Sequence, residues 1–345
     1  MHQDHLRLSI IVPAYNHRGD LQQCLATLGA AAGTNSEIIV VDDGSTEELR
    51  SVVTDSGTDV LRLSRNSGPS SARNLGARHA RGDILLFVDS DLVVSPGAVN
   101  ALIQRLEADP TVAAAFGSYD NHPQAKGVVS QYRNLLHHYV HQTGNVEAST
   151  FWAGFGAIRR SVFEAVGGFD EKRFPRCIED IELGGRLRRA GHRIILAKDI
   201  QGTHLKRWTL RSVIKTDVGC RAIPWTRLIM EQKQAPDDLN LKAGQRASVA
   251  LVGLACLFLA LSIVFASVRF PALEMSATAL LGVIALNRKL YGFFIHERGL
   301  LFAFAAIPLH ILYFLYSGVA YLWVWGEYRL RSVPFLQPLF RGTRV

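Results

Sequence analysis

The stretch Ile84-Leu85-Leu86-Phe87-Val88-Asp89-Ser90-Asp91 decides the fold of this chain. Five apolar residues followed directly by two carboxylates predict a strand that is buried on both faces and ends in a polar turn. Other apolar runs bounded by turn residues share this character, at residues 8–12, 37–41, 60–63 and 112–116. Helical stretches separate them, at residues 21–32, 70–80 and 96–108. Strands that alternate with helices predict an α/β fold with a largely parallel, doubly wound sheet.

The start of the last of these helices can also be predicted. Ser95 is a favoured N-cap residue, and Pro96 suits a first helical turn because the N–H that it lacks has no intrahelical partner there. We therefore expect a helix that is capped by Ser95.

The composition divides the chain into two parts. With 345 residues it is too long for one small core, and its hydrophobic residues, 48% of the total, form their longest uncharged stretches after Gln245. The net charge of +8 suits anionic lipid or a phosphorylated substrate. Lysine and arginine do not gather into a basic block with interleaved aromatics, so we do not expect nucleic acid as a partner.

The C-terminal part carries candidate membrane helices. Residues 247–268 and 300–325 are uncharged and long enough to cross a hydrocarbon core of roughly 30 Å, and residues 271–287 form a weaker candidate that contains Glu274. We predict a catalytic domain over residues 1–235, a linker over 236–246, transmembrane or interfacial helices over 247–326 and a basic tail over 327–345. Membrane lipids are thus expected partners.

The orientation in the membrane follows from the N-terminus and from the basic residues. The N-terminus has no apolar run typical of a signal peptide, so we expect a multi-pass protein of the inner (plasma) membrane with a cytoplasmic catalytic domain. Basic residues between and after the helices also favour the cytoplasm: Arg288, Lys289, Arg298, Arg329, Arg331, Arg341 and Arg344. Three complete crossings would place the last four on the opposite side, and a re-entrant segment would resolve this conflict.

Acidic turns follow two of the predicted strands. Ligands of doubly wound sheets bind beyond the carboxyl ends of the strands, where Asp42-Asp43 and the Asp89-Ser90-Asp91 turn are expected. Paired carboxylates there suit Mg²⁺ or Mn²⁺ shared with a diphosphate. The plainer interpretation of each turn alone is a tight turn or a helix N-cap, but two such turns at one edge favour a cationic ligand.

Two later motifs also carry candidate chemistry. Glu179 and Asp180 open a predicted helix that runs to about Ala190, where acidic residues commonly complement the helix dipole, and one of them is alternatively a general base. The run His204-Leu205-Lys206-Arg207-Trp208 combines a possible metal ligand, two cations and a flat aromatic, or forms an exposed basic loop.

As an ordered set, these motifs resemble family 2 glycosyltransferases with the GT-A fold, over about residues 7 to 215. The fold that this implies is a Rossmann-like, largely parallel sheet with flanking helices, followed here by an all-α membrane segment. The motifs that carry the resemblance are Ser9-Ile10-Ile11-Val12-Pro13-Ala14-Tyr15-Asn16, Val41-Asp42-Asp43-Gly44-Ser45, Asn66-Ser67-Gly68-Pro69 with Ala72-Arg73-Asn74-Leu75-Gly76, Gly82-Asp83 before Asp89-Ser90-Asp91, and Glu179-Asp180.

The resemblance implies a role for each matching residue. Asp180 is then the catalytic base and Glu179 shapes the site beside it. The residues expected to bind the nucleotide sugar are Pro13, Tyr15, Asn16, Asp42, Asp43, Arg73, Asp89, Ser90 and Arg207. Those expected to hold a divalent metal, Mn²⁺ or Mg²⁺, are Asp91, Asp89 and His204. Those expected on the acceptor side are Trp152, Gly154 and Trp208, with small residues leaving room for a sugar and aromatics stacking on it.

The implied reaction is inverting transfer from a nucleotide sugar, with a UDP-sugar favoured, to a hydroxyl of a lipid-linked or glycolipid acceptor. His204 to Trp208 has the spacing of the Gln-x-x-Arg-Trp motif of processive polysaccharide synthases, with His in place of Gln. A processive synthase and a polyprenyl-phosphate glycosyltransferase therefore remain alternatives. An alternative from another class is a non-catalytic membrane scaffold or transport accessory.

Overall fold

The computed structural model describes residues 7–31, 35–54, 58–232, 238–239 and 242–331. An eight-stranded sheet dominates its first part, in the order β3-β2-β1-β4-β7-β6-β8-β5. The four strands at one end are parallel and confirm the predicted apolar runs: β1 (Leu8–Ala14), β2 (Ser36–Asp42), β3 (Asp59–Arg62) and β4 (Ile84–Val88).

The other half of the sheet is mixed rather than parallel. β7 (Phe155–Arg159) runs antiparallel to both β4 and β6 (Val112–Tyr119), and β5 (Leu92–Val94) runs antiparallel to β8 (Arg193–His204). Only β6 and β8 pair in parallel in this half. β5, β7 and β8 were not predicted, because β5 has three residues and the other two carry glycine or charged residues between their apolar positions.

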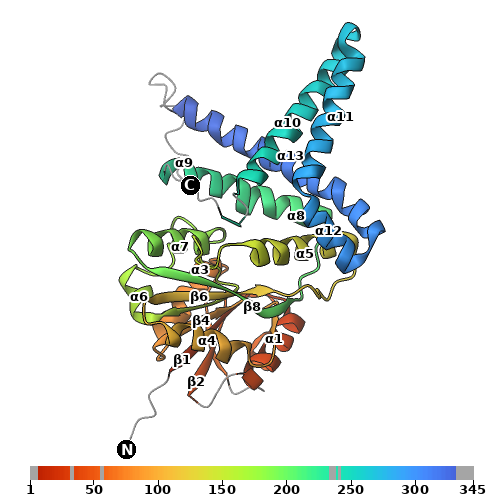
Figure 1. Cartoon of the computed structure of the whole chain (residues 1–345). Coiled ribbons are helices and arrows are strands. Elements are labelled where there is room, and N and C mark those ends of the chain that lie inside the picture. Colours follow the sequence, from red (N-terminus) through yellow and green to blue (C-terminus); the bar gives the residue numbers. More distant parts are fainter. Residues whose placement is uncertain (1–6, 32–34, 55–57, 233–237, 240–241, 332–345) are drawn as a thin grey trace, which may run out of the picture. The chain divides into compact units, whose positions relative to one another are not determined.

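Helices cover both faces of the sheet (Figure 1). Alternate residues of β1 point to opposite faces, as the period of two requires. Ile10 and Val12 pack into the large core beneath α1 (Arg18–Ala31) and α4 (Ala98–Ala108), whereas Ile11 lies against α3 (Pro69–His79) at Gly76. The remaining helices that precede β8 are α2 (Arg50–Thr54), α5 (Val128–Thr143), α6 (Arg160–Ala165) and α7 (Glu179–Arg189).

The predicted cap of α4 is wrong. The helix begins at Ala98 and its N-cap is Gly97, a residue with left-handed φ of 76° that provides no side-chain hydrogen bond. Ser95 stays one turn upstream, where its carbonyl accepts the Ala98 N–H. The turn Ser95–Gly97 thus reverses the chain before the helix starts.

The chain divides into two compact units. The first comprises Met1–Lys126 and Val140–Arg207, and the second comprises Gly127–Tyr139 and Trp208–Val345. The second unit takes up most of α5. The expected bounds, with a catalytic domain to residue 235 and a linker over 236–246, stay predictions, and α10 begins at Ala243, inside the expected linker.

The second unit is helical throughout its described residues. After Trp208 come α8 (Leu210–Asp217), a π-helical segment η1 (Val218–Ala222) and α9 (Ile223–Gln232). Three of the later helices are long and apolar enough to cross a membrane: α10 (Ala243–Val264), α11 (Arg269–Leu286) and α13 (Leu300–Arg331). The basic residues Arg288, Lys289 and Arg298 lie on α12 (Arg288–Arg298), between α11 and α13 in the sequence. The predicted basic tail lies outside the described residues beyond Arg331.

Candidate functional site

The candidate site lies where β4 and β7 pair. The backbone N–H of Asp89, directly after β4, donates to the carbonyl of Gly154 at 2.9 Å, just before β7. The preceding residue of this segment, Ala153, donates its N–H to the carboxylate of Asp180 at 3.3 Å. Adjacent residues of one segment therefore fix the Asp89 turn and the predicted base.

Arg73 of α3 connects the Asp89 turn with the start of α7, which carries Glu179 and Asp180. Its guanidinium donates to Asp89 Oδ1 at 2.7 Å and to Glu179 Oε1 at 2.6 Å, and it lies over the ring of Phe169. The Arg73 side chain is 5% exposed. Burial lowers the pKa of Arg73, but the charges of Asp89, Glu179 and Asp180 outweigh that effect and keep the group cationic. Arg73, predicted in the nucleotide pocket, is thus placed between the two carboxylate regions.

Asp180 is poised to change its protonation state near neutral pH. Burial raises its pKa to about 7, and the adjacent Glu179 carboxylate acts in the same direction, while Arg73 and the N–H groups of Ala153 and Ile181 oppose them. A general base works best when its pKa lies near the working pH. The helix α7 begins at Glu179, after Ile178 in a left-handed conformation, so both acidic residues lie in its first turn.

A glycine allows α7 to pack closely against the segment before β7, which carries Ala153. A Cβ on Gly184 would lie 2.2 Å from the backbone nitrogen of Phe151. No side chain can be accommodated at that distance without movement of the backbone. The close approach of α7 therefore depends on Gly184, and it places Asp180 within reach of the Ala153 N–H.

Asp91 and His204 face each other on the other side of the Asp89 turn. His204, the last residue of β8, lies with Nε2 3.4 Å from Asp91 Oδ2, and its ring stacks on Tyr119 with a centroid distance of 4.3 Å. The Leu205 N–H donates to the Asp91 carbonyl and fixes the pair. Burial raises the pKa of Asp91, but His204 and the charge of Lys206 outweigh it and hold that pKa below its usual range.

The predicted metal ligands are only partly brought together. Asp91 and His204 bring an oxygen and a nitrogen atom within 3.4 Å of each other. Such a pair fits a divalent cation that completes its coordination shell with diphosphate oxygens. Asp89 is instead held by Arg73. Within the described residues no three His, Cys, Asp or Glu side chains converge as a metal site. The structure thus brings Asp91 and His204 together, and their metal roles stay predictions.

The predicted nucleotide loops are built from hydrogen bonds to backbone. Asp42 accepts the Ser45 N–H at 2.8 Å and pairs with Arg62 at 3.4 Å. Asp43 accepts the N–H groups of Ser67 and Gly68, at 2.7 and 2.8 Å. Both carboxylates therefore shape the loops rather than point freely outward.

The loop after β1 is fixed in the same way. Asn16 has a left-handed φ of 56° and donates its N–H to the Ser45 hydroxyl oxygen, and its side-chain oxygen accepts the Thr46 N–H. Tyr15 directly follows β1, one residue beyond Ala14, and is 43% exposed. Its aromatic face is therefore accessible in this loop.

Comparison with known proteins identifies the family of this fold. Residues 9–167 match the model of Glycosyl transferase family 2. The chain carries a family 2 glycosyltransferase domain. The match covers β1 to β7 and includes the two acidic turns and Arg73; Glu179, Asp180 and His204 lie beyond it.

Curated relatives align with parts of this glycosyltransferase domain. A stretch of 108 residues is 39% identical to an uncharacterized glycosyltransferase of Haemophilus influenzae, covering 30% of this chain and 36% of that protein. A stretch of 168 residues is 27% identical to the undecaprenyl-phosphate 4-deoxy-4-formamido-L-arabinose transferase of Shewanella sediminis, covering 46% and 50%. The alignments thus span half or less of these relatives.

A solved structure shares the fold over most of the chain. The mannosyltransferase PcManGT from Pyrobaculum calidifontis, in complex with GDP-Man and Mn²⁺, superposes with a TM-score of 0.57 and covers 92% of this chain and 87% of its own. The sequences are 21% identical. This likeness confirms a GT-A fold followed by C-terminal helices.

The residues predicted on the acceptor side of the glycosyltransferase domain are arranged differently than expected. A Cβ on Gly154 would lie 2.6 Å from the Trp152 indole, so the space that we expected for a sugar is filled by that ring. Trp152 packs edge-on against Tyr119 at 4.7 Å and His141 at 5.2 Å between ring centroids. Gly154 therefore makes room for the indole, and Trp152 with Tyr119 forms an aromatic wall that continues to His204.

The last predicted residues fall at the end of the domain. Arg207 is exposed and is the last residue of the first unit, and its role in nucleotide-sugar binding stays a prediction. Trp208 belongs to the second unit, is buried, and donates its backbone N–H to the Ser130 hydroxyl. Ser90 is partly exposed between the two aspartates. Trp208 is thus a packing residue of the helical unit in this structure.

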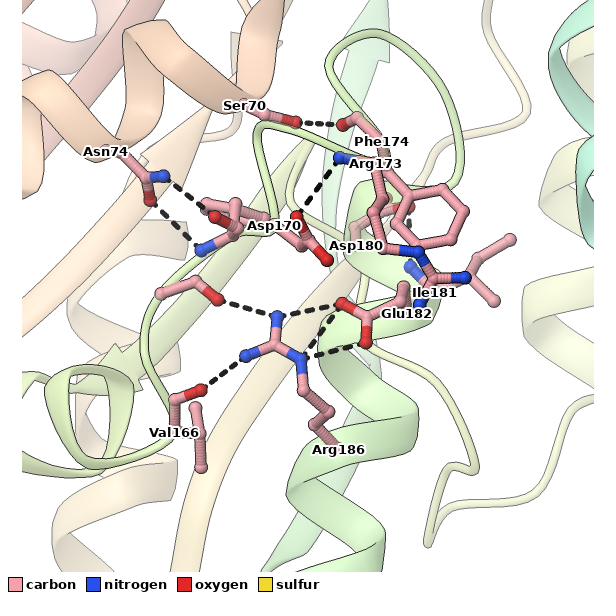
Figure 2. A network of polar contacts seen from close by, with 12 residues as sticks. Ser70, Asn74, Val166, Asp170, Arg173, Phe174, Asp180, Ile181, Glu182 and Arg186 are labelled. Atoms are coloured by element: carbon pink, nitrogen blue, oxygen red, sulfur yellow. Dashed lines mark hydrogen bonds and ion pairs between the residues drawn. The ribbon is translucent and has the colours of Figure 1, made fainter. Parts of the chain in front are cut away.

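A polar network holds the segment that leads into α7 (Figure 2). Asn74 of α3 exchanges two hydrogen bonds with the backbone of Phe169, at 2.8 and 3.0 Å, and Ser70 donates to the Phe174 carbonyl. From α7, Arg186 binds the Glu182 carboxylate and the carbonyls of Val166 and Gly168. The segment is fixed to both helices that carry Arg73 and Asp180. Sequence analysis missed this network, since it depends mainly on backbone carbonyls.

Proposed function

We propose that this protein is a membrane-associated glycosyltransferase that moves a sugar from a nucleotide diphosphate donor to a lipid-linked acceptor. The observation that carries the proposal is the arrangement around the Asp89 turn. The Asp180 carboxylate, with a pKa of about 7, accepts the Ala153 N–H. The Asp91–His204 pair lies on the other side of the Asp89 turn, and Gly154 holds this turn through its carbonyl. One group suits proton removal and the other suits anion or metal binding.

In the proposed reaction, each side of the site has a separate task. Asp180 takes the proton of the acceptor hydroxyl while that oxygen attacks the anomeric carbon from the face opposite the diphosphate, which inverts the configuration. Arg73 keeps Glu179 and Asp89 in place and limits the charge repulsion that raises the pKa of Asp180. Asp91 and His204 would hold a bound Mg²⁺ or Mn²⁺, which supplies positive charge to the departing diphosphate.

The acceptor is proposed to be a membrane lipid that carries a hydroxyl. Three helices long and apolar enough to cross a membrane support a membrane-bound substrate, and we place the protein in the plasma membrane with its catalytic domain in the cytoplasm. The titratable Asp180 favours a hydroxyl, because a phosphate oxygen is already ionised at neutral pH and needs no base.

A polyprenyl phosphate is the second candidate acceptor. It is favoured by the relative from Shewanella sediminis, an undecaprenyl-phosphate transferase that is 27% identical over 168 residues. If this lipid is the acceptor, removal of the Asp180 carboxylate should reduce transfer only slightly. The two candidates therefore differ in what the same variant does.

Release of nucleoside diphosphate tests the proposal. Detergent-purified protein would be given UDP-, GDP- and dTDP-sugars with Mn²⁺, together with a bacterial lipid extract or with undecaprenyl phosphate. We expect one donor to be used, only with lipid, and we expect Asp180→Asn to lower the rate by about 10²- to 10⁴-fold with nucleotide binding retained. If the protein is folded and binds nucleotide but releases no nucleoside diphosphate from any of these donors, a non-catalytic scaffold is supported instead.

A further inference from the structure

The charges of the second unit conflict with three membrane crossings. Basic residues lie between α11 and α13, at Arg288, Lys289 and Arg298, and again at the end of α13, at Arg329 and Arg331. Segments rich in Lys and Arg stay on the cytoplasmic side. If α10, α11 and α13 all crossed, these two groups would lie on opposite sides of the membrane.

We propose that α13 does not cross the membrane but lies along its surface, on the side of the catalytic domain, with its exposed apolar face against the lipid. Only the α10–α11 hairpin then crosses. Both basic groups lie on one side in this arrangement, and the charge conflict disappears.

The second half of α13 is held by short surface helices. The Tyr316 hydroxyl donates to Asp217 Oδ2 of α8 at 2.6 Å, and Arg227 of α9 donates to Glu327 at 2.9 Å. On a helix rising about 1.5 Å per residue, the two contacts are about 16 Å apart along α13 and about 15 Å apart along α8, η1 and α9. α13 therefore runs beside this segment, in the same direction.

The helices beside α13 cannot lie at the depth of the hydrocarbon core. α8 has eight residues, begins three residues after Arg207 of the catalytic unit, and exposes Arg211 and Lys215. Asp217 at its end is bound by Arg133 of α5 at 2.7 Å. Such charged groups are costly in hydrocarbon. Because Tyr316 is halfway along α13, the middle of this helix must lie at the level of these charges.

The first half of α13 has the same kind of neighbour. His310 packs near Tyr132 of α5, with a centroid distance of 6.3 Å, and Arg298, just before α13, donates to Gln131 of α5 at 2.7 Å. Both ends of the segment Gly127–Tyr139 continue directly into the catalytic unit. A segment of 13 residues that starts and ends there has no room to enter and leave a bilayer of roughly 30 Å, so it stays on the catalytic side.

The contact of α13 with the hairpin is at the base of the hairpin. Phe314 packs with Val252 in the first half of α10 and with Val283 near the end of α11. A Cβ on Gly318 would lie 3.0 Å from Val249, again in the first turns of α10. Figure 1 shows α13 crossing the two antiparallel helices rather than running along them. This is the packing of a helix that lies at the membrane surface while the hairpin enters it.

The exposed face of α13 identifies lipid as its partner. Its outward residues are large and apolar or aromatic: Leu301 is 87% exposed, Phe304 62%, Leu322 63% and Trp323 68%. Trp and Tyr are enriched where a membrane meets water, and apolar faces of interfacial helices enter the boundary between headgroups and acyl chains by about 5–10 Å. The hairpin, which carries the two other candidate spans, brings this face to the bilayer.

Cysteine labelling tests the number of crossings. In the full chain, Leu300→Cys and Leu330→Cys mark the two ends of α13, Ser267→Cys marks the turn between α10 and α11, and Val146→Cys marks the catalytic side; the unsubstituted chain is the blank. A membrane-impermeant maleimide applied to sealed vesicles should label positions 300, 330 and 146 from one face and position 267 from the other. Labelling of position 330 together with 267, or of all four from one face, would overturn the proposal.

Quenching by brominated lipids tests the depth. The fluorescence of Trp323 and Trp325 is obtained as the signal that Trp323→Phe and Trp325→Phe remove. This signal should be quenched more by lipids brominated near the headgroup than by lipids brominated near the end of the acyl chain. Stronger quenching by deep bromine would mean that this part of α13 is inserted, and would contradict a surface position. Neither measurement depends on activity, so the proposed function can fail while this proposal stands.

Discussion

Two acidic turns end buried strands of the same sheet, yet their carboxylates do different work. Asp42 and Asp43, after β2, accept backbone N–H groups and hold loops in shape. Asp89 and Asp91, after β4, face a guanidinium and an imidazole. A carboxylate satisfied by backbone is fixed with the fold, whereas one that faces a cationic side chain can exchange that partner for a ligand. The sequence pattern is alike in both turns, so the partners of the carboxylates, not the motif, distinguish the two turns.

Removal of Arg73 should have the largest effect on stability. Arg73→Gln leaves Asp89 and Glu179 without their shared cation in a buried setting, and we expect a loss of about 3–5 kcal/mol in the free energy of unfolding. Chemical unfolding of the detergent-purified protein measures it. Arg73→Lys is the matched control, because it keeps the charge and should recover part of the loss. An unchanged unfolding midpoint for Arg73→Gln would refute the bridge.

Asp91→Asn should separate activity from stability. We expect sugar transfer to fall by about 10²-fold or more, because the site loses charge needed near the diphosphate, while the unfolding midpoint stays nearly unchanged. Rates at several Mn²⁺ concentrations measure it, and Asp59→Asn, an exposed carboxylate on β3, is the control. If the variant keeps the Mn²⁺ dependence of the unsubstituted protein, the β4 turn is structural like the β2 turn.

Asp43→Asn should do the reverse. The amide keeps one acceptor but turns an NH₂ group toward one of the two backbone donors, Ser67 or Gly68, and we expect destabilisation by about 1–3 kcal/mol. Asp42→Asn should cost less, because its carboxylate has one short backbone donor and a 3.4 Å pair with a half-exposed arginine. Thermal unfolding ranks the two. A selective loss of nucleotide affinity at unchanged stability would contradict a loop-holding role.

The smallest expected effect is a shift in pH dependence. Asp180 must be ionised to act as a base, so kcat/KM should fall about tenfold per pH unit below its pKa of about 7 and level off above it. The Glu179 charge raises that pKa, so Glu179→Gln should move the acidic limb to lower pH. pH–rate profiles of the two proteins test this. A limb that stays in place would show that Glu179 does not act on the titrating group.

Much of the fold could be predicted because buried strands and helices leave strong local patterns. The five predicted strands correspond to β1, β2, β3, β4 and β6, and the weaker span at residues 271–287 is α11. β7 escaped prediction because Gly156 interrupts the apolar residues of Phe155–Arg159. Pairing direction is likewise invisible locally, so the mixed half of the sheet was not expected.

The candidate site was predictable in composition but not in pairing. The residue types at Asp89, Asp91, Asp180 and His204 could be singled out, since each lies at the end of a buried element or the start of a helix. Arg73 binds Asp89 and Glu179, a contact between distant segments that no local pattern indicates. The Trp152 ring folds back over Gly154, which depends on a side-chain conformation that the sequence does not specify. The metal, base and acceptor roles of these residues stay predictions.

The dipeptide Ala153-Gly154 sets a fixed spacing inside the protein. The N–H at its start donates to Asp180, and the carbonyl at its end accepts the backbone N–H of Asp89. Domain opening cannot widen a gap that is set within one dipeptide, so access for two bulky substrates has to come from side chains and loops around it. By the same reasoning, one residue inserted between these two positions would change the distance between Asp180 and the Asp89 turn while leaving every functional side chain present.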